Sequence, residues 1–373
     1  MNEPTDPWHY PRPDLAQAYL SGFDLGLTSA RGLFARRRMG KTEFLKYDLL
    51  PAAARAGYLA AYTNLWDSTD QPGQAIATAI LLAAQPKGVT KFWEGLKTPI
   101  RKLKGGAKLP LVEGSIELDL AGKEKIAVPA IQAALQASDQ TKKRLLLIID
   151  EAQVLADPAH KAVAHSLRAG LDIRKPSIKV LFAGSSEAAL RDMFSRAAAP
   201  FYNWAPLEPF PLLGREFVEA TVAQLRSVAK HPLSLGDALG AFAALNETPE
   251  FFRWYIERYL MYQLQGAEQA LRYTQSRVND DTGYARNWKA LKRSDRAVLL
   301  LLASGIQDLY GARALKQLAK ILGVPHLTIT VPRTSIRRLI DPRDQILARV
   351  DQGFYRFEDL EFQNWVAARR TVD

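Results

Sequence analysis

Residues 34–42 of this 373-residue chain read Phe34-Ala35-Arg36-Arg37-Arg38-Met39-Gly40-Lys41-Thr42, and they end as a phosphate-binding loop ends. An apolar run, residues 32–35, precedes the loop, and a helical pattern over residues 43–50 follows it. A phosphate-binding loop connects a strand to the helix that follows it, and the flanking sequences predict these two elements. This stretch therefore indicates an α/β fold with a nucleotide-binding loop.

One position departs from the GxxxxGK[ST] pattern, because Ala35 stands where the first glycine is usual. Alanine has the smallest side chain that carries a Cβ atom, so the match is weakened but not lost. We expect the backbone N–H groups from Ala35 to Glu43 to face the phosphates of a nucleotide. Lys41 would reach the terminal phosphates, and Thr42 would ligate Mg²⁺.

The composition is that of a globular protein, with 47% apolar residues, no cysteine and a formal net charge of +11. The lack of cysteine excludes disulfides, thiolate catalysis and Cys-based metal sites. The polar N-terminus shows no signal-peptide pattern and no apolar run is long enough for a membrane span, so we expect a cytoplasmic protein. The positive charge favours a polyanionic partner, although a basic solvated surface is the alternative.

The chain divides into three predicted regions. Residues 1–212 alternate β-rich and helical runs, which predicts a doubly wound parallel sheet. Residues 213–285 read as helices throughout, and residues 286–373 read as three helices followed by a β-hairpin, the pattern of a winged helix. The predicted strands of the first region are 32–36, 58–64, 144–150, 179–184 and 203–207. The predicted elements of the third are helices 294–304, 312–322 and 333–340 and strands 345–350 and 354–357.

An insertion is predicted between the second and third strands. Residues 97–108 are basic and rich in glycine, and residues 111–120 alternate in polarity as a small exposed hairpin does. This segment could contact nucleic acid or could be only a solvated insertion.

A second motif supplies the partner that the loop requires. The apolar run of residues 145–149 is followed by the adjacent carboxylates Asp150 and Glu151. At the carboxyl end of a strand, Asp150 would lie beside Thr42 and hold the metal through water. Glu151 is then placed to polarise the attacking water as a general base. Together, the two motifs predict an ATP hydrolysis site with Mg²⁺.

These residues resemble the AAA+/STAND-type ATPases, particularly their bacterial and archaeal "ATP-binding protein" families with a C-terminal winged helix. The resemblance rests on residues 35–45, on residues 147–153, on residues 181–186 and on the closing segment 353–365, and it extends over about residues 20–370. It implies a core sheet of order 5-1-4-3-2, a helical lid, ATP with Mg²⁺ and often a nucleotide-dependent homo-oligomer. Relatives include origin initiators, transposition regulators and defence switches.

The resemblance also implies roles for single residues. A polar residue after the strand 179–184 would sense the γ-phosphate, and Ser185 is the candidate, with helix capping as its alternative role. Arg191 or Arg196 would act in trans as an arginine finger, and Arg196 is preferred. Arg253 would reach the nucleotide from the lid, although no Gly-x-Pro precedes it, only Glu247-Thr248-Pro249.

The last predicted helix is a candidate nucleic-acid reader. Residues 288–373 hold 15 Lys and Arg against 9 Asp and Glu, a net charge of +6. Arg333, Arg337 and Arg338 would meet phosphates of double-stranded DNA, while Thr334 and Ser335 approach base edges in the major groove. The alternative is a winged helix that contacts protein.

We therefore expect an AAA+-like protein that hydrolyses ATP with Mg²⁺ and binds DNA. We also expect the bound nucleotide to control the assembly of this protein. The sequence leaves open a nucleotide-gated signalling or defence switch whose winged helix binds protein. It also leaves open a nucleotide-binding scaffold without useful turnover.

Overall fold

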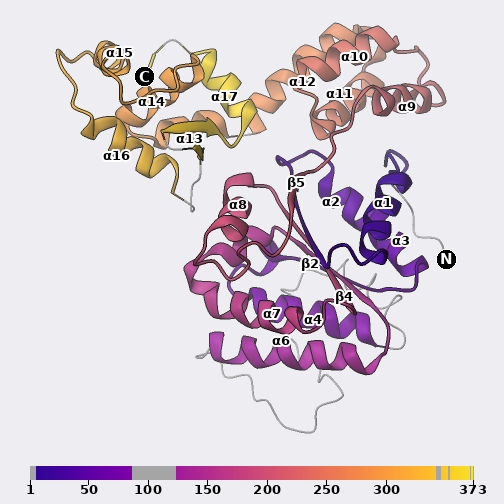
Figure 1. Cartoon of the computed structure of the whole chain (residues 1–373). Coiled ribbons are helices and arrows are strands. Elements are labelled where there is room, and N and C mark those ends of the chain that lie inside the picture. The colour runs from indigo at the N-terminus through magenta and orange to yellow at the C-terminus, as the bar shows by residue number, and fades with distance from the viewer. Residues whose placement is uncertain are drawn as a thin grey trace. The chain divides into compact units, whose positions relative to one another are not determined.

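The computed structural model describes residues 6–85, 123–281, 283–341, 346–351, 353–369 and 371–372. It separates into two compact units (Figure 1). The first contains residues up to Ala35 and Gly40–Phe210, and the second contains Arg36–Met39 and Pro211 onward. The boundary at residues 210 and 211 lies close to the end predicted for the first region.

A five-stranded parallel sheet forms the centre of the first unit. Its strands are β1 (Ala30–Phe34), β2 (Leu59–Asn64), β3 (Leu145–Asp150), β4 (Ile178–Gly184) and β5 (Leu207–Pro209). Their spatial order is β2-β3-β4-β1-β5 and every neighbouring pair is parallel. The order 5-1-4-3-2 and the doubly wound class expected from the sequence are therefore confirmed.

The central strands are buried on both faces, which explains their continuous apolar sequences. Every residue of β3 and β4 is buried, including Leu145, Leu146, Leu147 and Ile148, none of which exposes any surface. A strand whose two faces are both covered by helices has no solvent side, so its sequence does not alternate in polarity.

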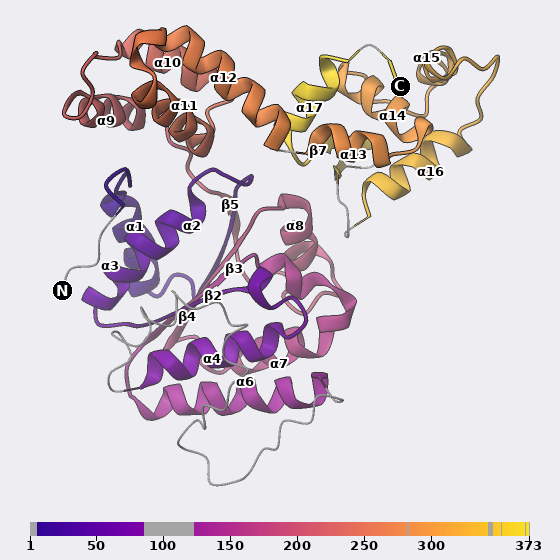
Figure 2. The ribbon, with the colours of Figure 1, turned by 180° about the vertical axis from the view of Figure 1, so that it is seen from behind.

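Helices cover the two faces of the sheet as separate layers (Figure 2). The layer of α4 (Pro72–Ala84), α6 (Lys123–Gln140) and α7 (Lys161–Asp172) supplies apolar residues such as Ile76, Ile131 and Leu167 to a core shared with one sheet face. The opposite layer contains α1 (Pro13–Asp24), α2 (Lys41–Glu43) and α3 (Leu50–Arg55). The helix α8 (Glu187–Ser195) follows β4.

The chain between α2 and α3 is a π-helical turn, Phe44–Leu49. Wide turns of this kind are rare and occur mostly as single insertions within α-helices. Asp48 lies in the turn, and its Oδ1 is 3.1 Å from Nε2 of His9 in the N-terminal segment. The segment before α1 is therefore attached to the helix that follows the nucleotide loop.

From Pro211 onward, the regular structure of the second unit consists, among the described residues, of helices and one hairpin. Its first helices are α9 (Arg215–Arg226), α10 (Leu235–Ala244), α11 (Pro249–Met261) and α12 (Gly266–Asp281), followed by α13 (Tyr284–Ala290). Next come α14 (Arg293–Ala303), α15 (Ala312–Leu322) and α16 (Thr330–Leu339), then β6 (Leu347–Asp351) paired antiparallel with β7 (Phe354–Phe357), and last α17 (Leu360–Ala367).

The three helices and the hairpin appear in the order predicted for a winged helix. Residues between Tyr284 and Val372 share one apolar core, with Leu299, Leu318 and Phe357 among its members. The start of this core at residue 284 lies next to the predicted boundary at 285 and 286, which stays a prediction because the structure divides the chain only once.

The predicted basic insertion, residues 97–108 and 111–120, lies outside the described residues. Among the helices of the described residues, none is both long enough and apolar enough to cross a bilayer.

Candidate nucleotide-binding site

The loop after β1 accommodates Ala35 without backbone strain. The N–H of Ala35 donates a hydrogen bond to the carbonyl of Gly184 at 3.2 Å, which continues the pairing of β1 with β4. The positive φ angles of the loop fall at Arg38 (68°) and Gly40 (80°), not at Ala35. Because φ at this position is not positive, alanine adopts the backbone conformation of the loop without strain, where the motif usually has glycine.

The middle of the loop, Arg36–Met39, groups with the second unit. Nε of Arg38 lies 3.5 Å from Oε1 of Glu250, and its guanidinium lies over the rings of Phe251 and Trp254 at 5.0 and 5.8 Å. A left-handed backbone at a non-glycine residue costs on the order of 1 kcal/mol. The contacts of Arg38 with α11 help to offset that cost.

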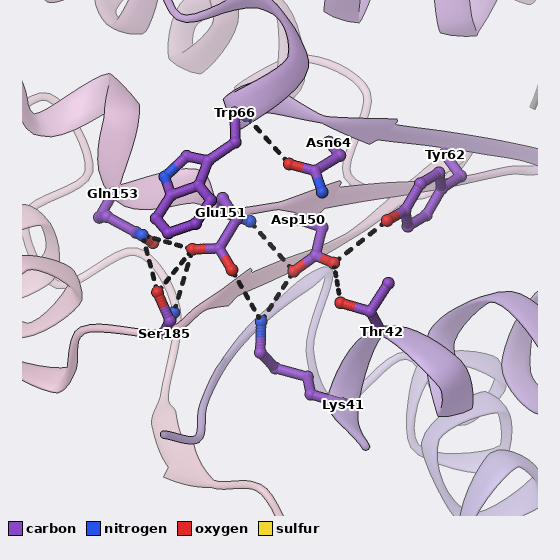
Figure 3. Close-up of polar contacts among 9 residues, drawn as sticks. All are labelled: Lys41, Thr42, Tyr62, Asn64, Trp66, Asp150, Glu151, Gln153 and Ser185. Carbon is purple, nitrogen blue, oxygen red and sulfur yellow. Dashed lines mark hydrogen bonds and ion pairs between the residues drawn. The ribbon is translucent and has the colours of Figure 1, made fainter. Parts of the chain in front are cut away.

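Asp150 is the centre of a buried network (Figure 3). Lys41 Nζ lies 2.8 Å from its Oδ1, and the Thr42 hydroxyl donates to its Oδ2 at 2.7 Å. The N–H of Glu151 also donates to Oδ1, at 3.0 Å. Asp150 is 0% exposed and Lys41 5% exposed. The structure thus brings Lys41, Thr42 and Asp150 together as the two motifs predict.

The pKa of Asp150 lies below its ordinary value. Burial acts to raise this pKa, but the charge of Lys41 and the hydrogen bonds from Lys41, Thr42 and the Glu151 N–H outweigh it. Asp150 is therefore a carboxylate at neutral pH, the form that a metal ion requires.

Tyr62 of β2, which belongs to neither of the two sequence motifs, is also part of this network. Its hydroxyl donates to Asp150 Oδ2 at 3.1 Å. Burial, together with the negative charge of Asp150, raises the pKa of Tyr62, so its hydroxyl keeps its proton. The sequence gives little indication of this role, because a tyrosine within an apolar strand more often belongs only to the core. In the sheet, Asn64 at the end of β2 pairs with Asp150, and this register brings Tyr62 within reach.

Glu151 turns the chain away from the strand in a left-handed conformation, with φ 54° and ψ 41°. Its Oε2 accepts hydrogen bonds from the Ser185 hydroxyl at 2.7 Å and from Gln153 Nε2 at 2.5 Å. Its Oε1 lies 3.8 Å from Lys41 Nζ. Ser185 thus joins the site as predicted, and the helix-capping role considered for it belongs to Ser186, whose hydroxyl accepts from the Ala189 N–H at 3.2 Å. Gln153 is a second residue that the sequence analysis did not assign.

This arrangement is suited to a phosphate-bound Mg²⁺ rather than to a metal held by protein alone. Within the described part of the chain, no three or more His, Cys, Asp or Glu residues form a group that could hold a metal ion. Thr42 and Asp150 offer a hydroxyl and a carboxylate 2.7 Å apart, and Mg²⁺ takes its remaining ligands from phosphate oxygens and water. The residues present therefore fit Mg²⁺ together with a nucleotide.

The candidate arginines lie outside this network. Arg191 pairs with Glu187 and Arg196 with Asp192, both at 2.5 Å and both along or just after α8. The Arg196 side chain is 70% exposed, and exposed pairs of this spacing contribute little to stability. Arg253 is exposed on α11 of the second unit.

The structure separates the five predicted DNA-contacting residues of α16 into two groups. Arg333, Thr334 and Arg337 are exposed. Ser335 is 0% exposed, so it has no surface to offer to a base edge. Nε of Arg338 donates to Asp295 Oδ2 at 3.0 Å, and the Asp295 side chain is only 3% exposed. Arg338 therefore connects α16 to α14, and we remove it and Ser335 from the candidate DNA contacts.

No protein-family model and no curated protein matches the sequence. Solved structures match it along nearly its whole length. The Walker-type ATPase PABY2304 of Pyrococcus abyssi is 14% identical, with 95% of each chain covered and a TM-score of 0.62. The ORC2 protein of Aeropyrum pernix, in ADPNP–ADP complexes, is 16% identical over 95% of this chain and 92% of its own, with a TM-score of 0.48. The ORC1 protein of Aeropyrum pernix, in complex with DNA, is 12% identical over 96% and 93%, with a TM-score of 0.47.

At these identities the comparisons show the fold alone. This chain shares the fold of that Walker-type ATPase, in agreement with the P-loop fold that the resemblance of its motifs implies.

Proposed function

We propose that this chain, with the fold of the AAA+ P-loop ATPases, binds ATP with Mg²⁺ and hydrolyses it. One observation carries the proposal: Lys41 and Thr42 both donate to the buried carboxylate of Asp150, and Glu151 follows directly. Two sequence motifs more than a hundred residues apart thus meet at one carboxylate, which supports a role in phosphoryl transfer. That chemistry depends on positioning and charge neutralisation.

The binding roles follow from the atoms available. The loop N–H groups from Ala35 to Glu43 cradle the phosphates, and Lys41 exchanges part of its contact with Asp150 for the terminal phosphates. Thr42 and Asp150 would hold Mg²⁺, directly and through water. When bound, the ion neutralises the charge that builds up on the phosphate oxygens.

The hydrolytic roles belong to Glu151 and Ser185. Glu151 is the carboxylate closest to Lys41 after Asp150, with its Oε1 directed to the ammonium at 3.8 Å. It would orient water for attack on the γ-phosphate as a general base. Ser185 contacts Glu151 and directly follows the adjacent strand β4, a place that suits a group that senses the γ-phosphate.

The test is phosphate release from ATP by the full chain, compared with the variants Lys41→Ala and Glu151→Gln. Lys41→Ala should weaken binding of a fluorescent ATP analogue at least about tenfold, since a charge-assisted phosphate contact is lost. Glu151→Gln should keep that binding and lower kcat on the order of 100-fold, in the range for a lost general base. Activity that neither substitution changes would overturn the proposal. Tight binding without phosphate release by the unmodified chain would favour the nucleotide-binding scaffold.

We further propose that the predicted C-terminal winged helix, residues 286–373, binds double-stranded DNA and that the bound nucleotide controls assembly of the chain. The net charge of +6 over residues 288–373 supports the first part, as do the exposed Arg333 and Arg337 on α16. The exposed Arg196 is available to reach a neighbouring subunit and supports the second.

The second candidate function is a nucleotide-gated signalling or defence switch whose winged helix contacts protein. The apolar side chain of Phe354, 53% exposed on the hairpin, favours it, since such a group suits a protein interface. The salt dependence of DNA binding separates the two candidates, because neutralised phosphates release counterions. Sizing of Glu151→Gln with ATP, with and without duplex DNA, tests assembly. A mass that stays monomeric under every condition would contradict it.

A further inference from the structure

Within the described residues, the carboxylate of Glu151 accepts hydrogen bonds through Oε2, whereas Oε1 takes part in an ion pair with Lys41 (Figure 3). Oε2 accepts from Gln153 Nε2 at 2.5 Å, from the Ser185 hydroxyl at 2.7 Å and from the Ser185 N–H at 3.3 Å. Oε1 has Lys41 Nζ nearby, at 3.8 Å, beyond hydrogen-bond distance. One oxygen is thus saturated with donors, and the other is directed toward the residue that would bind the phosphates.

The backbone conformation of Glu151 allows the Gln153 side chain to reach the Glu151 carboxylate. Side chains two residues apart on an α-helix do not face each other. Glu151 adopts a left-handed conformation and precedes a 3₁₀ turn, Ala152–Ala156, so the two side chains turn toward each other. A left-handed non-glycine residue costs free energy, and such strain is typical of positions where a side chain must point in one direction.

The packing around Gln153 shows that its position is constrained. A Cβ atom on Gly184, the last residue of β4, would lie 2.3 Å from Gln153 Oε1. That amide oxygen is buried and has no hydrogen-bond partner within the described residues. A buried polar atom without a partner is unfavourable, so the amide oxygen does not explain where this side chain lies. The hydrogen bonds that Nε2 donates explain it: one to Glu151 Oε2 at 2.5 Å and a longer one to the Ser185 hydroxyl at 3.3 Å.

We propose that Gln153 is a positioning residue for Glu151. With Ser185 it saturates Oε2 and so leaves Oε1 as the oxygen that polarises the attacking water. This inference rests on the proposed ATP hydrolysis. A general base must lie within hydrogen-bond reach of the proton that it takes, and a carboxylate free to rotate about its last bond would spend part of its time out of that reach. Gln153 itself does not touch substrate.

The test compares three substitutions at residue 153 in the full chain. Gln153→Met keeps the length of the side chain and removes the donor, so kcat for ATP should fall about 10- to 100-fold. Gln153→Glu has nearly the same shape and places a second carboxylate beside Glu151, so its kcat should fall further. Gln153→His restores a ring N–H donor and should recover part of the loss. In all three, KM and the affinity for a fluorescent ATP analogue should stay within about twofold, because the phosphate contacts are untouched.

Ser186→Ala is the matched control, since it alters the residue next to Ser185 and removes a helix cap without touching Glu151. It should lower the melting temperature and leave kcat near the unmodified value. The inference is overturned if Gln153→Met hydrolyses ATP at the unmodified rate while Glu151→Gln does not. It is also overturned if kcat and affinity fall together in Gln153→Met, which would indicate general damage to the site. If Lys41→Ala and Glu151→Gln both keep full activity, the proposed function fails and the positioning role fails with it.

Discussion

At the scale of single residues, the loop shows why one departure from a motif is tolerated. Ala35 is 6% exposed and its backbone lies outside the positive-φ region, so its methyl group fills space at the end of β1. Gly40, with φ 80°, needs the freedom of glycine. The two glycine positions of the motif therefore differ in their physical requirement: the backbone needs glycine at residue 40 but not at residue 35.

Replacing Ala35 with glycine should not improve nucleotide binding, because no strain is relieved. It should lower the free energy of unfolding by about 0.5–1 kcal/mol, since glycine gains more freedom in the unfolded chain. Urea unfolding gives the stability, and titration with a fluorescent ATP analogue gives the affinity. A several-fold gain in affinity for Ala35→Gly would show that the Cβ atom obstructs the phosphates.

At the scale of elements, the π-helical turn Phe44–Leu49 connects the nucleotide loop to the N-terminal segment. The His9 and Asp48 side chains are 10% and 6% exposed, and Asp48 Oδ2 has no hydrogen-bond partner within the described residues. The hydrogen bond with Asp48 raises the pKa of His9, against the effect of burial, and the negative charges of Asp48, Glu43 and Asp6 add to this. The contact between His9 and Asp48 therefore depends on the protonation of His9, which changes with pH near neutrality.

The direction in which stability changes with pH follows from the raised pKa of His9. His9 has a higher pKa when folded than its ordinary value of 6.5, so its stabilisation is complete below that value. It is lost as pH rises through the raised pKa of the folded protein. His9→Gln should therefore lower the melting temperature at pH 5.5 to 6 and have a smaller effect at pH 8.5. Melting curves of both proteins between these limits test this, and an equal loss at all pH values would contradict it.

At the scale of the whole molecule, charge is distributed unevenly. Residues 288–373 carry +6 of the total of +11. If these charges bind duplex DNA, the logarithm of the binding constant should fall linearly with the logarithm of salt concentration. The substitution of Arg333 and Arg337 together by alanine should then reduce that slope by roughly 2, or about 0.9 for each phosphate contact.

The matched control removes the same charge elsewhere in the second unit. Arg226 and Lys230 are exposed near the end of α9, and their double alanine variant should leave the slope nearly unchanged. Equal effects of the two double variants would indicate a general charge effect. No binding by the unmodified chain at low salt would favour the protein-binding switch.

The motif residues were predictable because their roles depend on local sequence. Lys41 and Thr42 begin a helix after a loop, and Asp150 ends an apolar strand, so each position follows from its own few neighbours. Parallel strands place their carboxyl ends at one edge, which is why two distant motifs could be expected to meet. The sheet order was then expected from the resemblance of these motifs to those of the AAA+/STAND-type ATPases.

Other features were decided only by the tertiary structure. Tyr62 and Gln153 reach the site through the register of β2 with β3 and through the left-handed turn at Glu151, which no local pattern of residue types records. On α16, Ser335 and Arg338 read as surface residues, yet packing against α14 buries the first and pairs the second with Asp295. The sequence by itself identified Lys41, Thr42 and Asp150 as neighbours in one site, because charge and strand or helix preference are local properties. Which polar side chains are buried, and which oxygen of Glu151 accepts the hydrogen bonds of Gln153 and Ser185, depend on neighbours that only folding brings together.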